Sequence, residues 1–407
     1  TRPGEKMRNL FRLDEYFARS MCHRGGGPTN ASPVSRSGRA RGARTSNAAS
    51  RCTGTPARVW PLAFYSAWVA VLTAGSLPQA AGAASAPLQS VLSPAGIQAT
   101  RIAHLWNLTL IVCSGVFAAV LLVLLVAIVR NRRSDHRTTP DLSSLAQPEG
   151  NTRRMVVAAT LLSSVLLFGL LFADVLTDHA LSTLPVANAL TIEVTGHQWW
   201  WEARYPSGRN GDADHFTVAN ELHIPVGRPV IVRLRTTDVI HTFWVPNLHG
   251  KRDMIPGRDA TIEFRADKAG TYRGQCAEFC GFEHALMAFY VVAESPAAYD
   301  AWAAHQRGAA TLSAGALLQR GQQVFTSGTC ASCHTVRGTS ATGTLGPDLT
   351  HLMSRQTIAA GTLPNTTGNL AGWIVDAPRL KPGTTMPPNR LAPADLQALL
   401  AWLGTLR

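Results

Sequence analysis

The chain has 407 residues, which is too long for one ordinary hydrophobic core and predicts several domains. Its formal net charge of +13 would suit a nucleic-acid-binding protein, but most of that charge lies in residues 1–58, which hold twelve Lys and Arg against three Asp and Glu. This segment has few large apolar residues and no aromatic interleaving for stacking on bases, so we expect a basic disordered extension and no nucleic-acid partner.

An apolar run at 59–74 follows the basic extension and leads to Ala84-Ser85-Ala86. A short apolar core after basic residues, ended by small residues in the Ala-x-Ala pattern, is typical of a secretory signal peptide. We therefore expect residues 59–86 to be a signal peptide. An uncleaved membrane helix is the alternative.

Two longer apolar runs follow, within residues 87–185. The run 106–129 carries no charge and, like the run 155–173, is long enough to span a hydrocarbon core of ~30 Å. The Arg-rich loop 130–154 between them belongs on the cytoplasmic side of a membrane, because basic loops are retained there. The sequence therefore predicts a two-helix transmembrane hairpin, with everything after about residue 177 on the opposite side.

The pattern changes to short strands over residues 186–295. β-branched and aromatic runs alternate with Gly, Pro and Asp turns. The clearest runs are 190–194, 229–234, 261–264 and 288–292. Several short strands at even spacing predict an all-β Greek-key sandwich or barrel, with functional residues on the loops at one end.

The loop from Cys276 to Met287 holds two thiols, one imidazole and one thioether, the other donors being Cys280 and His284. Soft sulfur donors select copper, zinc or iron–sulfur, and imidazole suits copper and zinc. Two Cys four residues apart can bridge two metals, and His241 on an upstream strand could supply a second imidazole. A disulfide or a zinc loop is the alternative, but zinc rarely takes Met, and a disulfide explains neither His284 nor Met287.

A carboxylate lies close in sequence to the upstream imidazole. Asp238 precedes His241 by three residues. Carboxylates commonly accept a hydrogen bond from the second ring nitrogen of a metal-bound His. We expect Asp238 to orient His241.

Residues 296–315 are Ala-rich and predict a linker with a short helix, which leads to a last domain at 316–407. In that domain Cys330 and Cys333, with His334 directly after, form the c-type haem attachment pattern. Two thiols at this spacing can form thioethers to the haem, and His334 can be an axial ligand. A redox dithiol is the alternative.

Met386 is the preferred second axial ligand of that haem. It lies in a loop stiffened by two following prolines, and Met opposite His suits electron transfer. The competing Met353 comes only nineteen residues after His334, which leaves little chain to wrap a haem. The domain ends in a helix with one buried face, because its leucines recur at helical spacing: Leu396, Leu399, Leu400 and Leu403.

These motifs carry a resemblance. The loop 276–287 resembles the binuclear copper (CuA) loop of subunit II of haem–copper cytochrome c oxidases, and 196–201 and 246–258 resemble neighbouring segments of that family. The resemblance covers about residues 87–295. Residues 316–407 resemble a class I cytochrome c domain, including Gly346-Pro347-Asp348-Leu349 as the loop near the proximal His.

The resemblance implies a cupredoxin-like copper domain with a full set of ligands. Cys276 and Cys280 would bridge both coppers, with His241, His284, Met287 and the Glu278 carbonyl completing the two coordination spheres. The Glu278 carboxylate would face a magnesium ion at the contact with the catalytic subunit. Electrons from cytochrome c would enter the copper domain at Trp199.

We therefore expect subunit II of an aerobic terminal oxidase, with a cytochrome c domain fused at its C-terminus in the caa3-type arrangement. Electrons from an external cytochrome c or another donor would pass through the chain's own haem c and CuA to a separate catalytic subunit that reduces oxygen to water. No catalytic residue is expected in this chain. Its partners would be oxidase subunit I, further oxidase subunits and the lipid bilayer.

The same resemblance implies a multi-pass protein of a bacterial inner membrane with both cofactor domains in the periplasm. Two rival functions remain open at this point. The chain could be the copper subunit of a nitric oxide reductase, or a membrane-tethered electron carrier that is not an oxidase component.

Overall fold

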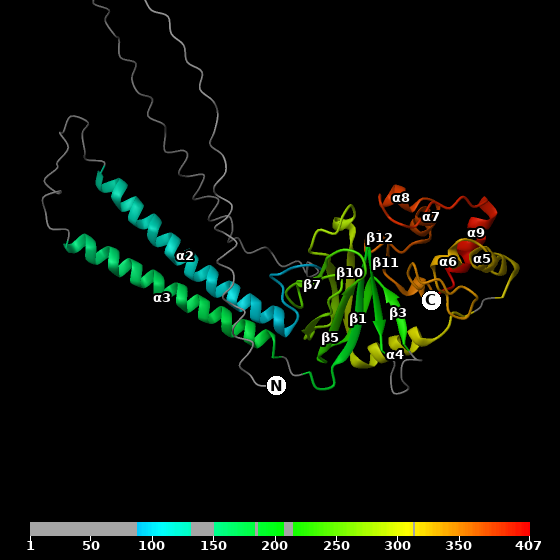
Figure 1. The fold of residues 1–407 in the computed structure, drawn as a ribbon, viewed down its shortest axis with the longest axis horizontal. Coiled ribbons are helices and arrows are strands. Elements are labelled where there is room, and N and C mark those ends of the chain that lie inside the picture. Colours follow the sequence, from blue (N-terminus) through cyan, green and yellow to red (C-terminus); the bar gives the residue numbers. More distant parts are fainter. Residues whose placement is uncertain (1–87, 132–149, 184–185, 207–214, 312–313) are drawn as a thin grey trace, which may run out of the picture. The chain divides into compact units, whose positions relative to one another are not determined.

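The computed structural model describes residues 88–131, 150–183, 186–206, 215–311 and 314–407. The expected basic extension and signal peptide lie outside the described residues, as does most of the basic loop between the two apolar runs. Three parts are described below: two long helices, a β-sandwich domain over residues 186–311, and a C-terminal domain over residues 314–407 (Figure 1).

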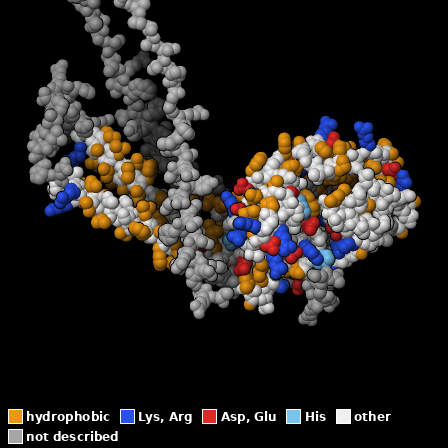
Figure 2. Space-filling model, in the orientation of Figure 1, with side chains coloured by type: hydrophobic (Ala, Val, Ile, Leu, Met, Phe, Trp, Pro, Cys, Tyr) orange, Lys and Arg blue, Asp and Glu red, His pale blue; other side chains and the backbone are white. Residues whose placement is uncertain are grey.

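The two apolar helices are α2 (Ile97–Asn131) and α3 (Gly150–Leu181). Both are long and apolar enough to cross a membrane, and apolar side chains cover their surfaces (Figure 2). Both extend beyond the predicted 106–129 and 155–173, because backbone hydrogen bonding continues where the charge-free run has ended. At the extended ends Arg101 donates a hydrogen bond to the Ala180 carbonyl, which ties α2 to α3.

The β-sandwich domain consists of two main sheets and a small ribbon. The first sheet has the order β3-β2-β1-β5-β8, with β1 (Leu190–His197), β2 (Trp200–Tyr205), β3 (Phe216–Ala219), β5 (Val230–Thr236) and β8 (Ala260–Phe264). The second has the order β4-β10-β9, with β4 (Glu221–Pro225), β9 (Gly270–Gln275) and β10 (Ala288–Glu294). The ribbon pairs β6 (His241–Phe243) with β7 (Arg252–Met254). All four clearest predicted runs form strands, and β1–β5 and β4–β10 are parallel pairs.

The core of the sandwich follows from side-chain alternation along the strands. In β1 every second residue is buried, beginning with Leu190 and Ile192, because successive side chains point to opposite faces. Trp201 is fully buried and packs against Phe289 of the opposite sheet, with ring centroids 4.9 Å apart. Of the three consecutive tryptophans at 199–201, Trp201 therefore belongs to the core.

The helix expected in the linker also packs against the sandwich. α4 (Pro296–Arg307) is capped by the Ser295 hydroxyl, which accepts from the Ala298 N–H. Tyr299 of this helix is buried in the sandwich core, and Trp302 stacks on His223 at 4.1 Å. The helix therefore covers one side of the β-sandwich domain as well as leading toward the next domain.

The C-terminal domain is mainly helical. Its elements are α5 (Ala316–Ser327), α6 (Cys330–Cys333), the 3₁₀ helix Leu352–Ser354, β11 (Thr357–Ile358), β12 (Leu363–Pro364), α7 (Thr367–Val375), α8 (Ala377–Leu380) and α9 (Pro393–Leu403). Phe325 of α5 and Trp402 of α9 meet in its core, with ring centroids 5.1 Å apart. The predicted all-β and all-α domains and the two apolar helices are thus confirmed.

The packing of α5 on α9 gives a first testable prediction. An ideal Cβ at Gly321 would lie 2.1 Å from the Ala398 carbonyl oxygen, whereas one at Gly368 in α7 meets nothing within 4 Å. Gly321→Ala should therefore lower the free energy of unfolding by about 1–3 kcal/mol, because overpacking forces the helices apart. Gly368→Ala should leave it unchanged or raise it by up to about 1 kcal/mol, because Ala favours a helix. Thermal unfolding of both variants, followed by haem absorbance, checks this; equal melting temperatures would contradict the packing argument.

Candidate metal and haem centres

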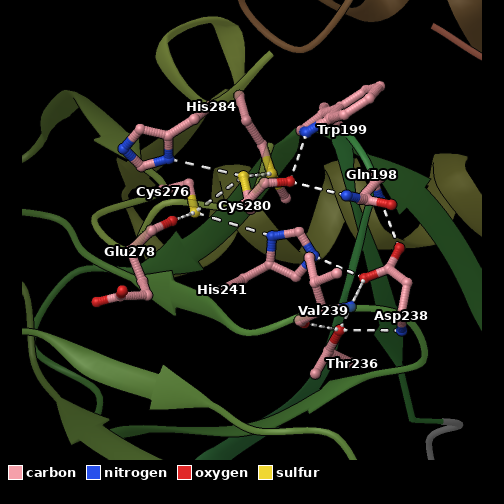
Figure 3. A network of polar contacts seen from close by, with 11 residues as sticks. Gln198, Trp199, Thr236, Asp238, Val239, His241, Cys276, Glu278, Cys280 and His284 are labelled. Atoms are coloured by element: carbon pink, nitrogen blue, oxygen red, sulfur yellow. Dashed lines mark hydrogen bonds and ion pairs between the residues drawn. The ribbon is translucent and has the colours of Figure 1, made fainter. Parts of the chain in front are cut away.

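The loop between β9 and β10 brings the two thiols of the first motif together. The Cys276 N–H donates to the Met287 carbonyl at 3.0 Å, which closes the base of the loop. The sulfurs of Cys276 and Cys280 lie 3.7 Å apart, and Figure 3 shows them facing each other. A disulfide bond is about 2.05 Å long, so these cysteines form none. Both side chains are buried.

The other predicted donors converge on these sulfurs. His241 Nδ1 lies 3.8 Å from Cys276 Sγ and the Glu278 carbonyl oxygen 3.2 Å from it. His284 Nδ1 lies 3.6 Å and Met287 Sδ 3.8 Å from Cys280 Sγ. The structure therefore assembles two thiols, two imidazoles, a thioether and a carbonyl at one end of the sandwich. This donor set fits soft metal ions, and the thioether fits copper better than zinc.

The electrostatics of the two thiols favour metal binding. The pKa of Cys276 lies far below that of an ordinary thiol, because its sulfur shares a hydrogen bond with Cys280 and accepts another from His241. The pKa of Cys280 is raised in turn, because Cys280 keeps the proton that the pair shares. The pair thus offers one thiolate before any metal arrives, and thiolate is the ligating form.

The Asp238 carboxylate lies behind the His241 ring. Its oxygen Oδ1 is 2.8 Å from His241 Nε2, so that nitrogen donates to the carboxylate and Nδ1 faces the sulfurs (Figure 3). The carboxylate also accepts from the Gln198 N–H at 2.7 Å and the Val239 N–H at 2.6 Å. Burial would raise the pKa of Asp238, but these hydrogen bonds outweigh it and the pKa falls. For His241, burial lowers the pKa, and bonding to Cys276 and Asp238 more than reverses this.

Trp199 contacts the same loop from the other side. Its Nε1–H donates to the Cys280 carbonyl at 2.9 Å, and the Gln198 side chain donates to the same oxygen at 2.8 Å (Figure 3). Gln198 therefore links Asp238 to the Cys280 end of the loop. Gln198 was not predicted as a site residue, because its only signal in the sequence is its place beside Trp199.

The second motif places Cys330 and Cys333 on the short helix α6, with His334 directly after it. His334 Nδ1 lies 2.8 Å from the Pro347 carbonyl, which orients the ring and leaves Nε2 for another partner. A Cβ at Gly346 would lie 2.7 Å from the ring, so glycine is needed there. Burial lowers the pKa of His334, which keeps the imidazole neutral as an axial ligand must be. These features fit a c-type haem.

The two candidate methionines differ in their surroundings. Met353 packs against the hydrophobic core of the C-terminal domain, and its N–H donates to the Leu406 carbonyl at 2.8 Å. Met386 lies half-buried in the loop after α8 and is not among the residues that pack on that core. A core role for Met353 leaves Met386 as the better candidate for a haem ligand.

Comparison with known proteins adds independent findings. Residues 209–295 match the family model described as cytochrome C oxidase subunit II, periplasmic domain, and residues 318–407 match that of cytochrome c. The chain is 35% identical over 329 residues to a cytochrome c oxidase subunit 2 of Alkalihalophilus pseudofirmus, covering 78% of this chain and 91% of that protein. It is 28% identical over 362 residues to that of Bacillus subtilis, covering 84% and 98%. Among solved structures, the periplasmic domain of subunit II of cytochrome oxidase from Bradyrhizobium japonicum is similar, at 32% identity and a TM-score of 0.28, over 30% of this chain and 97% of that one.

Proposed function

The chain belongs to the cytochrome c oxidase subunit 2 family, and we propose that its predicted donor residues form the two cofactor sites of that role. As a member it is an electron-transfer component of a haem–copper oxidase, with copper in the β-sandwich domain and haem c in the C-terminal domain. When bound, these groups supply the reversible one-electron chemistry that side chains lack. The single observation that carries the proposal is the convergence of four further donors on two sulfurs that lie 3.7 Å apart. The matches do not favour a nitric oxide reductase subunit or an independent carrier.

In the copper site Cys276 and Cys280 would bridge the pair, with His241, His284, Met287 and the Glu278 carbonyl as the remaining ligands. The burial of Cys276 and Cys280 would exclude water from the bridge. Asp238 would hold His241 in the tautomer that ligates through Nδ1. Such outer contacts fix the ligands before the metal binds, so little rearrangement accompanies a change of charge.

In the haem site Cys330 and Cys333 would form the thioethers, with His334 and Met386 as axial ligands. The Pro347 carbonyl supports this assignment, because it fixes the His334 ring through Nδ1. The close approach of Gly346 supports it as well, because it leaves the ring little freedom to turn.

Glu278 supports a contact with the catalytic subunit. Its carbonyl lies against Cys276 while its carboxylate is exposed and points away from the sulfurs (Figure 3). The neighbouring Phe279 is 75% exposed and Phe282 is 89% exposed. An exposed acid next to exposed aromatic side chains suits a protein interface that also holds a cation, and we propose a magnesium ion there, shared with oxidase subunit I. Further oxidase subunits and an external cytochrome c would complete the assembly.

The topology of the chain follows from its apolar helices. We propose two crossings of a bacterial inner membrane by α2 and α3, with the Arg-rich connection on the cytoplasmic side. A reporter active only in the periplasm should be active when fused after Gly308 and silent when fused after Ser143. The reverse pattern would contradict this topology.

Removing the carboxylate behind His241 should weaken copper binding without unfolding the domain. Asp238→Asn keeps the size of the side chain but loses the charge, and such changes cost about 10–100-fold in metal affinity. Copper retained after dialysis against a chelator measures this. The control is Asp259→Asn, because Asp259 is exposed and pairs with Arg235 on the same domain. Equal copper retention in both variants would contradict an orienting role of Asp238.

A further inference from the structure

Lys381 lies buried where the C-terminal domain contacts the β-sandwich domain. The side chain comes from the end of α8 in the C-terminal domain and is only 2% exposed. Its ammonium lies 2.9 Å from the Trp199 carbonyl and 2.9 Å from the Leu286 carbonyl, both in the β-sandwich domain. A third carbonyl, that of Ala359 in its own domain, lies at 3.4 Å. An ammonium has three donors and no acceptor, so three carbonyls satisfy it.

The charge of Lys381 means that its ammonium can be buried only where hydrogen-bond acceptors surround it. Burial lowers its pKa to about 8, partly opposed by the Glu283 carboxylate, so the amine remains mostly protonated at neutral pH. Glu283 is itself 3% exposed, and burial raises its pKa, partly opposed by Lys381. A lysine is almost never fully buried unless its charge is satisfied. The two carbonyls of the β-sandwich domain are therefore a condition for burying this ammonium.

Trp199 lies between two glycines at the same contact. A Cβ at Gly281, in the loop 276–287, would lie 3.1 Å from Cζ2 of the Trp199 indole. A Cβ at Gly383 would lie 3.5 Å from Cη2 and Cζ3 of the same ring. Both glycines have positive φ, +110° and +95°, a conformation that side chains disfavour. The indole therefore contacts both loops. Its Nε1–H bonds to the Cys280 carbonyl in the loop 276–287, and its six-membered ring contacts Gly383 in the loop that carries Met386.

Backbone and side-chain bonds elsewhere hold the same two domains together. The Ala288 N–H, in β10, donates to the Ala360 carbonyl at 3.0 Å. The Gln356 N–H donates to the Glu221 carboxylate, in β4, at 3.0 Å. Both acceptor–donor pairs join the second sheet of the sandwich to the segment around β11. The contact between the two domains therefore includes these hydrogen bonds as well as those of Lys381.

We propose that Lys381 is a positioning residue that holds the Met386 loop against Trp199, so that Trp199 joins the haem and copper sites inside one chain. The proposal rests on the proposed function, because it takes both cofactor sites as assigned. One electron would pass from the reduced haem, which is oxidised, to the copper pair, which is reduced. External cytochrome c returns the haem to its reduced state.

Amine labelling of the unmodified full-length chain tests the docking directly. Lys251 and Lys268 are exposed and serve as internal references. Acetylation followed by peptide mass spectrometry should find Lys381 modified at least about tenfold more slowly than Lys268, because its three donors are occupied. Equal rates at Lys381 and Lys268 would overturn the proposal. This measurement needs no variant, so a folding defect cannot obscure it.

A matched pair of variants tests the consequence for electron transfer. Lys381→Met keeps the length and apolar stem but removes the ammonium donor from all three carbonyls. Arg379→Met removes the same charge from an exposed position two residues away. The measurement injects one electron photochemically into the haem of the isolated oxidase. Transfer from haem to copper should slow about tenfold in Lys381→Met alone. Loss of a charged hydrogen bond should lower by about that factor the population in which the C-terminal domain is docked on the β-sandwich domain. Haem and copper spectra should stay intact in both variants. An unchanged rate with intact spectra would overturn the proposal, while absent spectra in the unsubstituted chain would contradict the proposed function instead.

Discussion

Cys276→Ser should remove the copper pair and leave the haem in place. Cys276 Sγ has the His241 ring, the Glu278 carbonyl and Cys280 Sγ as neighbours, so the substitution would remove the proposed bridging ligand at the centre of the donor set. A hydroxyl is a poor substitute for thiolate toward a soft metal. We expect at least about a tenfold loss of bound copper and complete loss of the mixed-valence absorption of the pair.

The matched control is Cys113→Ser, since Cys113 lies exposed on α2. Metal analysis and absorption spectra of the full-length chain measure both variants. The haem spectrum should be unchanged in each, because Cys330 packs against a separate hydrophobic core and Cys333 lies on the same short helix. Loss of copper and haem together in Cys276→Ser would contradict two independent sites.

Met386→Ala should abolish the weak sulfur–iron absorption band and lower the haem potential. Thioether opposite imidazole favours reduced iron, and axial ligands set haem potentials over about 0.8 V, so a fall of about 0.1 V or more is expected. Electron delivery to copper should slow as a result. Redox titration and the absorption band measure the change.

Met353→Ala is the matched control for the ligand assignment. Its side chain packs on the core of the C-terminal domain, so the variant should lose stability, by up to about 2–5 kcal/mol for a fully buried Met and less for a half-buried one. The absorption band and the potential should stay nearly unchanged. A band lost in Met353→Ala and kept in Met386→Ala would reverse the assignment, while the site at Cys330, Cys333 and His334 would stand.

Features that depend on local pattern could be predicted from the sequence. The charge-free runs predicted the two apolar helices, and the leucines recurring on one face predicted the C-terminal helix α9, in which Leu399 and Leu403 are buried. The donors from Cys276 to Met287 lie together because one loop carries them. His241 and Asp238 could be added, because three residues bring an imidazole and a carboxylate into contact at a strand end.

Features that depend on distant residues could not be predicted in this way. Nothing local shows that β1 pairs in parallel with β5, or that Tyr299 of α4 enters the sandwich core. Gln198 donates to an oxygen 82 residues away, and Lys381 to one 182 residues away. Lysine is usually a solvated surface residue, so its sequence position gave no signal of a buried contact.

The order of electron flow tests the central claim most directly. In the isolated oxidase, one electron injected photochemically into the haem should leave it as the copper absorption changes by the same amount, before oxygen is consumed. Loss of Cys276 should stop this transfer while the haem still accepts the electron. Two results would contradict the assignment of this chain as an electron-transfer subunit that acts through both sites. In one, the haem is reoxidised and oxygen is consumed at the normal rate without any copper signal. In the other, both continue at the normal rate after the copper has been removed.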